Sequence, residues 1–333
     1  MGRGGLINSI LIVQGWAMLW VVIGHAPLDS VAGNPTIVQW LYDIAYAFHM
    51  PLFVFVSGYL FQLTRIAKGY SYKDMMVEKL QRLGIPYVAF TVIAMVCKSI
   101  MPEAVKRQSA LSISEFAYAM ICPSDGPLNE LWFVMMLLCL FALYPLWKMR
   151  GKWALVLAVA LVVLLHAVPF FEPNIFAVQS LCQHAIYFLL GTLAARYRSE
   201  RLFSRRNVVA VVITLALSAL SDYLMGWHIK PFQMTIALTG ILLSLLLAEG
   251  CNRFIPWLFA SFRGYTYQIY LMGIFVQIAV KYLYRHNFIE NYALGYVLCI
   301  VLAIYIPVGV SFVAQRINNR FINLCLGLRG KSK

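Results

Sequence analysis

The sequence predicts an all-α integral membrane protein that crosses the bilayer many times. Of its 333 residues, 62% are hydrophobic and only 12% are charged, and the mean hydropathy is +0.76. A soluble domain carries roughly 25% charged residues, so this composition excludes an ordinary soluble protein. Apolar stretches of about 20 residues, the length of a membrane-spanning helix, recur along the whole chain.

Ten such stretches are expected to span the membrane. Lys and Arg concentrate in cytoplasmic loops, and with both termini in the cytoplasm 21 of the 27 basic residues fall on the inner side. This topology also explains the net charge of +14, so no nucleic-acid partner is expected. No soluble domain is evident, and residues 1–333 are expected to form one transmembrane domain. The predicted spans are 6–25, 43–63, 83–100, 130–147, 153–170, 180–197, 207–226, 232–250, 265–283 and 292–315.

His25 closes the first span and is the strongest candidate for proton transfer. A histidine in an apolar helix is costly to place and titrates near neutral pH. Gln14 lies eleven residues earlier. That spacing is about 20° past three full turns, so both side chains share one helix face, about 16 Å apart along the axis. The pair fits either a functional face or a helix that buries two polar residues against its neighbours.

The polar residues of the chain are distributed unevenly across the predicted membrane. All six histidines and nine of the thirteen acidic residues fall at outer span ends or in outer loops. This distribution fits a proton-transfer site on the outer side, or chance segregation of a small set. No paired-cysteine or HExxH motif is present, and the histidine spacings are not those of ligands, so no metal site is expected.

The second span carries two motifs. Pro51, in the segment Phe-His-Met-Pro-Leu-Phe at 48–53, is typical of a first helical turn. Ser57 and Gly58 form a step of small side chains that permits close approach of another backbone or of a narrow ligand. Ordinary helix packing is the alternative explanation of that step.

Three basic residues precede the third span at its inner end: Lys73, Lys79 and Arg82. Lys79 and Arg82 are three residues apart and therefore share one side of a helix. Together the three are expected to form a cationic mouth suited to phosphate groups. Ordinary anchoring of an inner loop is the alternative.

Two further segments carry candidate side chains. Glu130 and Trp132 open the fourth span from the outside, and Tyr267 and Tyr270 begin the ninth span. Glu130 is an acid at a membrane entry, and Trp132 is either an interfacial aromatic or a stacking wall. The two tyrosines could offer hydroxyls to a sugar or belong to the aromatic belt at the interface.

In this order, these segments resemble the membrane acyltransferase-3 family, particularly its branch of fucose 4-O-acetylases and bacterial polysaccharide O-acetyltransferases. The resemblance covers nearly the whole chain. It rests on the histidine of the first span and on four ordered motifs. These motifs are Phe-His-Met-Pro-Leu-Phe with Ser-Gly-Tyr-Leu at 48–60, Arg-Leu-x-Ile-Pro-Tyr at 82–87, Leu-Trp-Phe at 131–133 and Tyr-x-Ile-Tyr-Leu at 267–271.

The resemblance implies an O-acyltransferase of the bacterial inner membrane. Such an enzyme moves an acetyl or other short acyl group from cytoplasmic acetyl-CoA, its co-substrate, to a hydroxyl of a cell-surface or lipid-linked glycan. It implies His25 as general base, with Glu130, in preference to Asp29, supporting the imidazole, and no metal. The implied acetyl-CoA contacts are Gln14, Ser57, Lys73, Lys79 and Arg82, and the implied acceptor contacts are His49, Trp132, Tyr267 and Tyr270.

Three positions depart from the family pattern. Gln14 stands where the family has Arg or Lys, followed by ten residues and then the histidine, and Leu11 stands where an acid is expected. Gly273 stands where the late tyrosine motif often continues to a histidine. Two alternatives therefore stay open: a transporter or flippase for a glycan or small metabolite, and a catalytically degenerate member that assists polysaccharide export.

Overall fold

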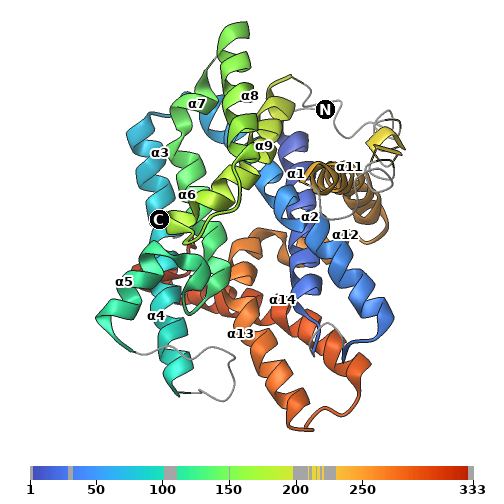
Figure 1. Ribbon diagram of the computed structural model, residues 1–333. Coiled ribbons are helices and arrows are strands. Elements are labelled where there is room, and N and C mark those ends of the chain that lie inside the picture. The colour runs from blue at the N-terminus through green and yellow to red at the C-terminus, as the bar shows by residue number, and fades with distance from the viewer. Residues whose placement is uncertain are drawn as a thin grey trace. The chain divides into compact units, whose positions relative to one another are not determined.

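The computed structural model describes residues 3–28, 33–100, 111–149, 151–197 and 230–328, with short stretches between 209 and 220. These described residues form helices and no strand (Figure 1). The helices are α1 (Arg3–His25), α2 (Thr36–Phe61), α3 (Tyr72–Lys79), α4 (Ile85–Ile100), α5 (Ile113–Ile121), α6 (Trp132–Ala142), α7 (Tyr144–Lys148), α8 (Lys152–Ala167), α9 (Val178–Tyr197), α11 (Lys230–Phe254), α12 (Pro256–Phe262), α13 (Thr266–Arg285), α14 (Tyr292–Ile317) and α15 (Arg320–Cys325).

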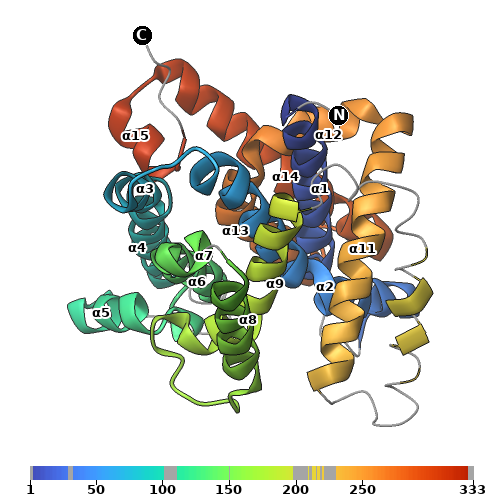
Figure 2. The same ribbon diagram turned by 90° about the horizontal axis from the view of Figure 1, so that it is seen from above.

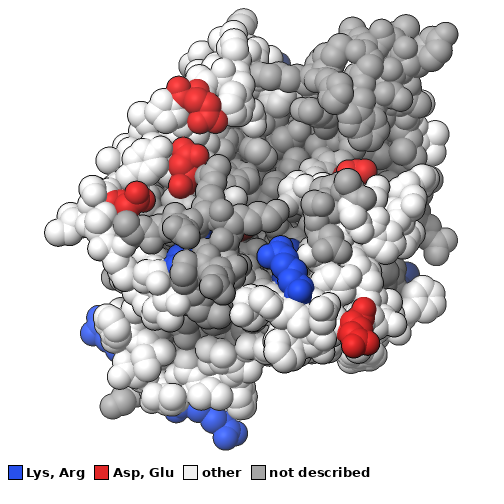
Figure 3. All heavy atoms as spheres, turned by 60° about the horizontal axis from the view of Figure 1, so that its bottom comes forward, with Lys and Arg blue, Asp and Glu red and all other residues white. Residues whose placement is uncertain are grey.

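The helices confirm an all-α, multi-pass membrane protein. In the part of the chain that the structure describes, six helices are long and apolar enough to cross a bilayer, and each overlaps a predicted span: Ile7–His25, Thr36–Ile66, Tyr72–Ile100, Ile175–Tyr197, Met234–Phe254 and Tyr292–Ile317. On the face shown in Figure 3, charged side chains are separate spots among uncharged residues. The number of spans and the location of the termini stay predictions.

The other predicted spans have a mixed outcome. The stretches 130–147 and 153–170 contain the shorter apolar helices Asn129–Ala142 and Leu155–Ala167, and 265–283 corresponds to α13. Most of 207–226 lies outside the described residues. The stretch 130–147 is divided into α6 and α7 because Pro145 lacks the backbone N–H that would continue the helix.

Pro51 lies in the interior of α2, so the prediction that it marks a first helical turn was wrong. The helix already begins at Thr36, in a segment whose apolar pattern is interrupted by Gln39 and Asp43. An interior proline leaves one carbonyl without its usual helical donor. Membrane helices tolerate this loss where neighbouring groups or local adjustments satisfy the carbonyl.

The chain divides into two compact units, each described here by itself. Unit 1 comprises Met1–Gln62 and Leu190–Val308, and unit 2 comprises Leu63–Leu189 and Gly309–Lys333. The boundaries fall within α9 and α14. The expectation of one transmembrane domain stays a prediction.

In unit 1, α1, α2 and α11 lie side by side (Figure 2). Helix α2 is antiparallel to α1, because Trp20 contacts Phe48 at 5.4 Å between ring centroids while Gly24 abuts Ala45. Helix α13 is parallel to α1. Arg263, just before α13, donates to Asn8 Oδ1 at 2.7 Å, and Lys281, near the end of α13, donates to the His25 carbonyl at 2.7 Å.

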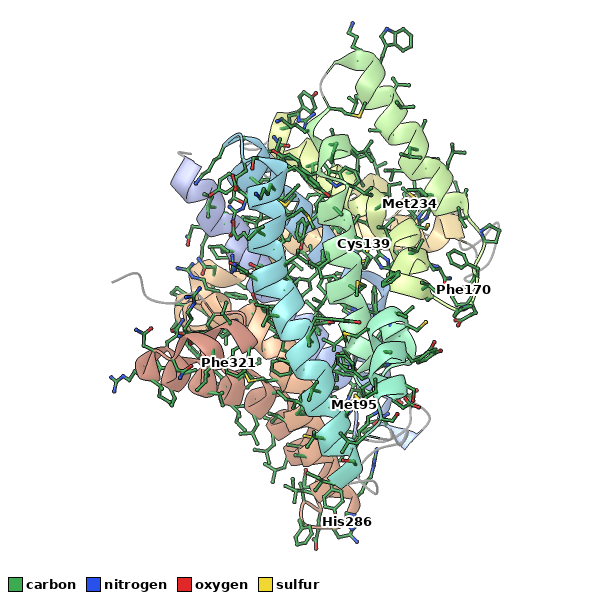
Figure 4. All side chains as sticks on the ribbon, turned by 90° about the vertical axis from the view of Figure 1, so that its left-hand side faces the viewer. Met95, Cys139, Phe170, Met234, His286 and Phe321 are labelled. Carbon is green, nitrogen blue, oxygen red and sulfur yellow. The ribbon has the colours of Figure 1, made fainter. Side chains whose placement is uncertain are left out.

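In unit 2, α6 packs against α3 and the π-helical turn that follows it. The Tyr87 hydroxyl of α4 donates to the Ala119 carbonyl of α5 at 2.9 Å. Figure 4 shows this group of helices with Met95 on α4 and Cys139 on α6. Cys139 Sγ donates to the Phe176 carbonyl at 3.5 Å, which ties α6 to the turn before α9.

Candidate active site

The imidazole of His25, the last residue of α1, lies among polar side chains of α2. Its Nδ1 is 3.3 Å from the hydroxyl oxygen of Tyr46, and its ring centroid is 6.4 Å from that of His49. The rings of Tyr46 and His49 are 5.0 Å apart. His49 is buried, His25 is partly exposed and Tyr46 is 43% exposed. The structure therefore gathers two imidazoles and a phenol at the end of α1.

Tyr46 is the member of this cluster that sequence reasoning missed. It lies three residues before His49 on α2, so the two side chains share one helix face. That spacing could have indicated that Tyr46 lies beside His49. A tyrosine near the end of a predicted span is, however, explained equally well as an interfacial aromatic residue.

The end of α1 is held by hydrogen bonds from α13. Gln277 Nε2 donates to the Val22 carbonyl at 2.9 Å, and Lys281 Nζ donates to the His25 carbonyl at 2.7 Å. The last four carbonyls of a helix have no intrahelical donor, and these two belong to that set. Sequence reasoning counted Lys281 only as an outer basic residue, because it could not tell which helix lies beside α1.

Gln14 and Ser57 lie away from this cluster, toward the other end of unit 1. Gln14 is partly exposed and sits about 16 Å from His25 along the axis of α1. Ser57 is eight residues beyond His49. Because α2 is antiparallel to α1, Ser57 lies about 12 Å from His49 in the direction of Gln14. The two predicted contacts for acetyl-CoA thus lie on the same side of His25.

Tyr267 and Tyr270 also lie toward that end. They are in the first turns of α13, fourteen and eleven residues before Lys281. This places them about 16–21 Å along the axis from the level of His25. Contact of the two tyrosines with the acceptor stays a prediction. At this distance they are not next to His25, where the reacting hydroxyl of the acceptor would lie.

An apolar cavity of about 350 Å³ lies between α1, α2 and α11 in unit 1. Trp16 and Trp20 line it from α1, and the Trp16 indole donates to Ser244 Oγ at 3.1 Å. Trp16 is about 160° around α1 from Gln14, so the cavity does not open on the face that carries Gln14 and His25.

The predicted cationic mouth lies in unit 2. Lys73 is exposed on α3, and Lys79 Nζ lies 3.9 Å from the centroid of the Phe141 ring at the end of α6. The ring holds the Lys79 ammonium by a cation–π contact. Lys79 therefore lies at the opposite end of α6 from Trp132.

A carboxylate that sequence reasoning missed lies within this basic group. Glu78 forms an ion pair with Arg65, and its Oε1 is 3.7 Å from a terminal nitrogen of Arg82. Arg65 is buried, with its guanidinium 4.7 Å from the centroid of the Tyr70 ring. Glu78 thus neutralises part of the positive charge of the basic group that we expected to bind phosphates.

Glu130 and Trp132 lie at the start of α6 in unit 2. Glu130 is half-buried in the helical turn that precedes α6. The Trp132 ring is 5.6 Å from that of His184, whose Nδ1 lies 2.8 Å from the Ser180 carbonyl. Trp132 is therefore next to an imidazole. The contact of Glu130 with the His25 ring stays a prediction, and Asp29 lies outside the described residues.

These features define a class: an all-α, multi-pass membrane protein with a partly exposed histidine at a helix end. The chain belongs to the acyltransferase-3 family, since the model of that family's acyltransferase domain matches residues 7–312. This match spans both units and supports membrane acyltransferase activity. No curated protein and no solved structure matches the chain. Among the described residues, no group of three His, Cys, Asp or Glu could hold a metal ion.

Proposed function

We propose that the protein transfers an acetyl or other short acyl group from acetyl-CoA to a hydroxyl of a cell-surface or lipid-linked glycan, with His25 as general base. The contact of His25 Nδ1 with the Tyr46 hydroxyl carries this proposal. It engages one ring nitrogen and leaves Nε2 for the acceptor. Family membership supplies the reaction class, and the partial exposure of His25 supplies access.

In the proposed reaction, the His25 tautomer with its proton on Nδ1 donates to the Tyr46 oxygen. Its Nε2 lone pair takes the proton of the acceptor hydroxyl as the oxygen attacks the thioester carbonyl. The carbon–sulfur bond then breaks, and the imidazolium returns the proton to the CoA sulfur. General base catalysis of this kind contributes about 10²–10⁴-fold. No covalent enzyme intermediate is needed.

The remaining residues have proposed binding roles. Lys73, Lys79 and Arg82 would meet the CoA phosphates on the cytoplasmic side of a bacterial inner membrane. Gln14 and Ser57 would line the path of the pantetheine arm. His49 and Trp132 would contact the acceptor, as would Tyr267 and Tyr270 if the glycan extends along α13. Glu130 would stabilise the imidazolium, as acids do in catalytic triads.

Mass spectrometry of surface glycans from cells with and without the protein tests the proposed function. We expect a glycan to lose the mass of one acyl group when the gene is deleted. A transporter or flippase would instead leave acylation intact while the glycan accumulates on the inner face. Unchanged acylation in the deletion strain would contradict the proposal.

Gln14 provides a specific prediction about the donor side. If its amide donates a hydrogen bond to acetyl-CoA, Gln14→Arg should keep activity and Gln14→Leu should lower kcat/KM about tenfold, the worth of one such bond. Kinetics of the two variants with acetyl-CoA varied would check this. Equal kcat/KM for wild type and Gln14→Leu would show that the position has no role in binding the donor.

Tyr46 provides a prediction about the general base. Tyr46→Phe removes the hydroxyl that contacts His25 and should lower kcat about tenfold with little change in KM. Tyr42→Phe is the matched control, because the Tyr42 ring contacts the Tyr46 ring on the same helix, with 4.3 Å between the ring centroids. If both variants have the same kcat, the Tyr46 hydroxyl does not orient the imidazole.

A further inference from the structure

We propose that Gln277 and Lys281 of α13 are positioning residues that hold the imidazole of His25 in its reactive place. This inference rests on the proposed function for its kinetic consequence, whereas the geometric claim can be tested without activity. Neither residue needs to touch a substrate. Both act through the backbone at the end of α1.

The hydrogen bonds from α13 reach the carbonyls that α1 itself leaves without donors. Gln277, which is 2% exposed, donates to Val22, and Lys281 donates to His25. The two donors are four residues apart and so share one face of α13. The Lys281 ammonium also lies at the carboxyl end of α1, where the helix dipole favours a positive charge. Such bonds are stronger in surroundings of low dielectric constant.

An apolar cluster holds the chain directly after His25 to the same helix. Ala26 and Leu28 are buried with Val280 of α13 and Cys299 of α14. Val280 directly precedes Lys281, so one turn of α13 contacts the chain on both sides of His25. The backbone around His25 is thus held by hydrogen bonds to the Val22 and His25 carbonyls and by apolar packing of Ala26 and Leu28.

Helix α13 can serve as this support because it is itself packed tightly. A Cβ on Gly273 would lie 3.0 Å from the Ala303 carbonyl oxygen, so α13 and α14 approach closely at that glycine. Gly273 is the position where the family motif often has a histidine. Here the missing side chain permits close packing of the helix that carries Gln277 and Lys281.

The expected consequence of losing this support is kinetic. A displacement of about 1 Å at a reacting group can cost about 10²-fold in rate. We expect Lys281→Met to lower kcat about tenfold or more while KM for acetyl-CoA changes less than about twofold. Lys281→Arg should restore most of kcat, because it keeps a cationic donor. Arg285→Met is the matched control: it removes the same charge one turn further along α13, at an exposed position.

A second readout does not depend on acyl transfer. Diethyl pyrocarbonate modifies accessible imidazoles, and peptide mass spectrometry gives a rate for each histidine. We expect His25 to react several-fold faster in Lys281→Met, because the end of α1 frays without its donor. His286, exposed at the end of α13 (Figure 4), should react at the same rate in both proteins and is the internal reference. Gln277→Met replaces the amide with a side chain of similar volume and should raise the modification rate of His25 in the same way. This variant replaces Lys281→Met in the experiment if Lys281→Met does not fold.

The outcomes separate the two proposals. If His25→Ala abolishes transfer but both α13 variants keep the wild-type kcat and the wild-type His25 modification rate, the positioning role is wrong and the proposed function stands. If the wild-type protein transfers no acyl group, the proposed function fails. The modification rate of His25 then decides on the positioning role by itself.

Discussion

Replacing His25 with alanine is expected to lower kcat for acyl transfer about 10²–10⁴-fold, the usual contribution of a general base. The protein should stay folded. Lys281 donates to the backbone carbonyl of residue 25, and that carbonyl remains after the substitution. Alanine also suits the last turn of a helix better than histidine does. Release of the CoA thiol by purified protein in detergent, in the presence of a glycan acceptor, measures the effect.

The control for this variant is His286→Ala. His286 is exposed at the end of α13 and should have no effect on kcat. Elution of each variant as a single species in size-exclusion chromatography would establish that the protein is folded. Full acyl transfer by folded His25→Ala protein would remove His25 from the reaction.

Gly191→Ala is expected to cause the largest loss of stability among the substitutions considered. In unit 1, a Cβ at Gly191 would lie 2.1 Å from the Phe55 carbonyl oxygen and 2.9 Å from the Tyr59 nitrogen. Both are backbone atoms of α2, so α9 and α2 must move apart to admit the methyl group. Overpacking of this kind costs about 1–3 kcal/mol, and we expect a value near 3 kcal/mol because no side chain can yield.

Gly250→Ala is the matched control for this prediction. Gly250 is also a helical glycine, in α11, and an added Cβ would meet nothing within 4 Å. Alanine there should stabilise the helix by about 0.5–1 kcal/mol. Thermal unfolding of the two variants in the same detergent should therefore give midpoints on opposite sides of the wild type. A wild-type midpoint for Gly191→Ala would show that the two helices are not in close contact there.

Much of the fold could be predicted because the apolar runs are long and the bilayer limits the possible structures. The details that failed depend on local chemistry. Pro145 ends α6 early, whereas Pro51 is accommodated inside α2. A proline in an apolar run therefore does not by itself show whether the helix breaks.

The candidate site was predictable only in part. His25 and His49 stand out in the sequence because polar groups in apolar helices are costly. The roles of Gln277 and Lys281 depend on which helix lies beside α1 and in which direction it runs, and a single sequence does not contain that information. The same limit applies to Glu78, which pairs with Arg65 from thirteen residues earlier in the chain.

The most direct test of the proposed function follows the acyl group itself. Membrane vesicles containing the protein, with their cytoplasmic face outward, would receive acetyl-CoA that carries an isotope label in the acetyl group. We predict that the label appears as an ester on the glycan in wild-type vesicles and is absent with His25→Ala. Equal labelling of the glycan in both preparations, or none in either, would contradict acyl transfer by His25.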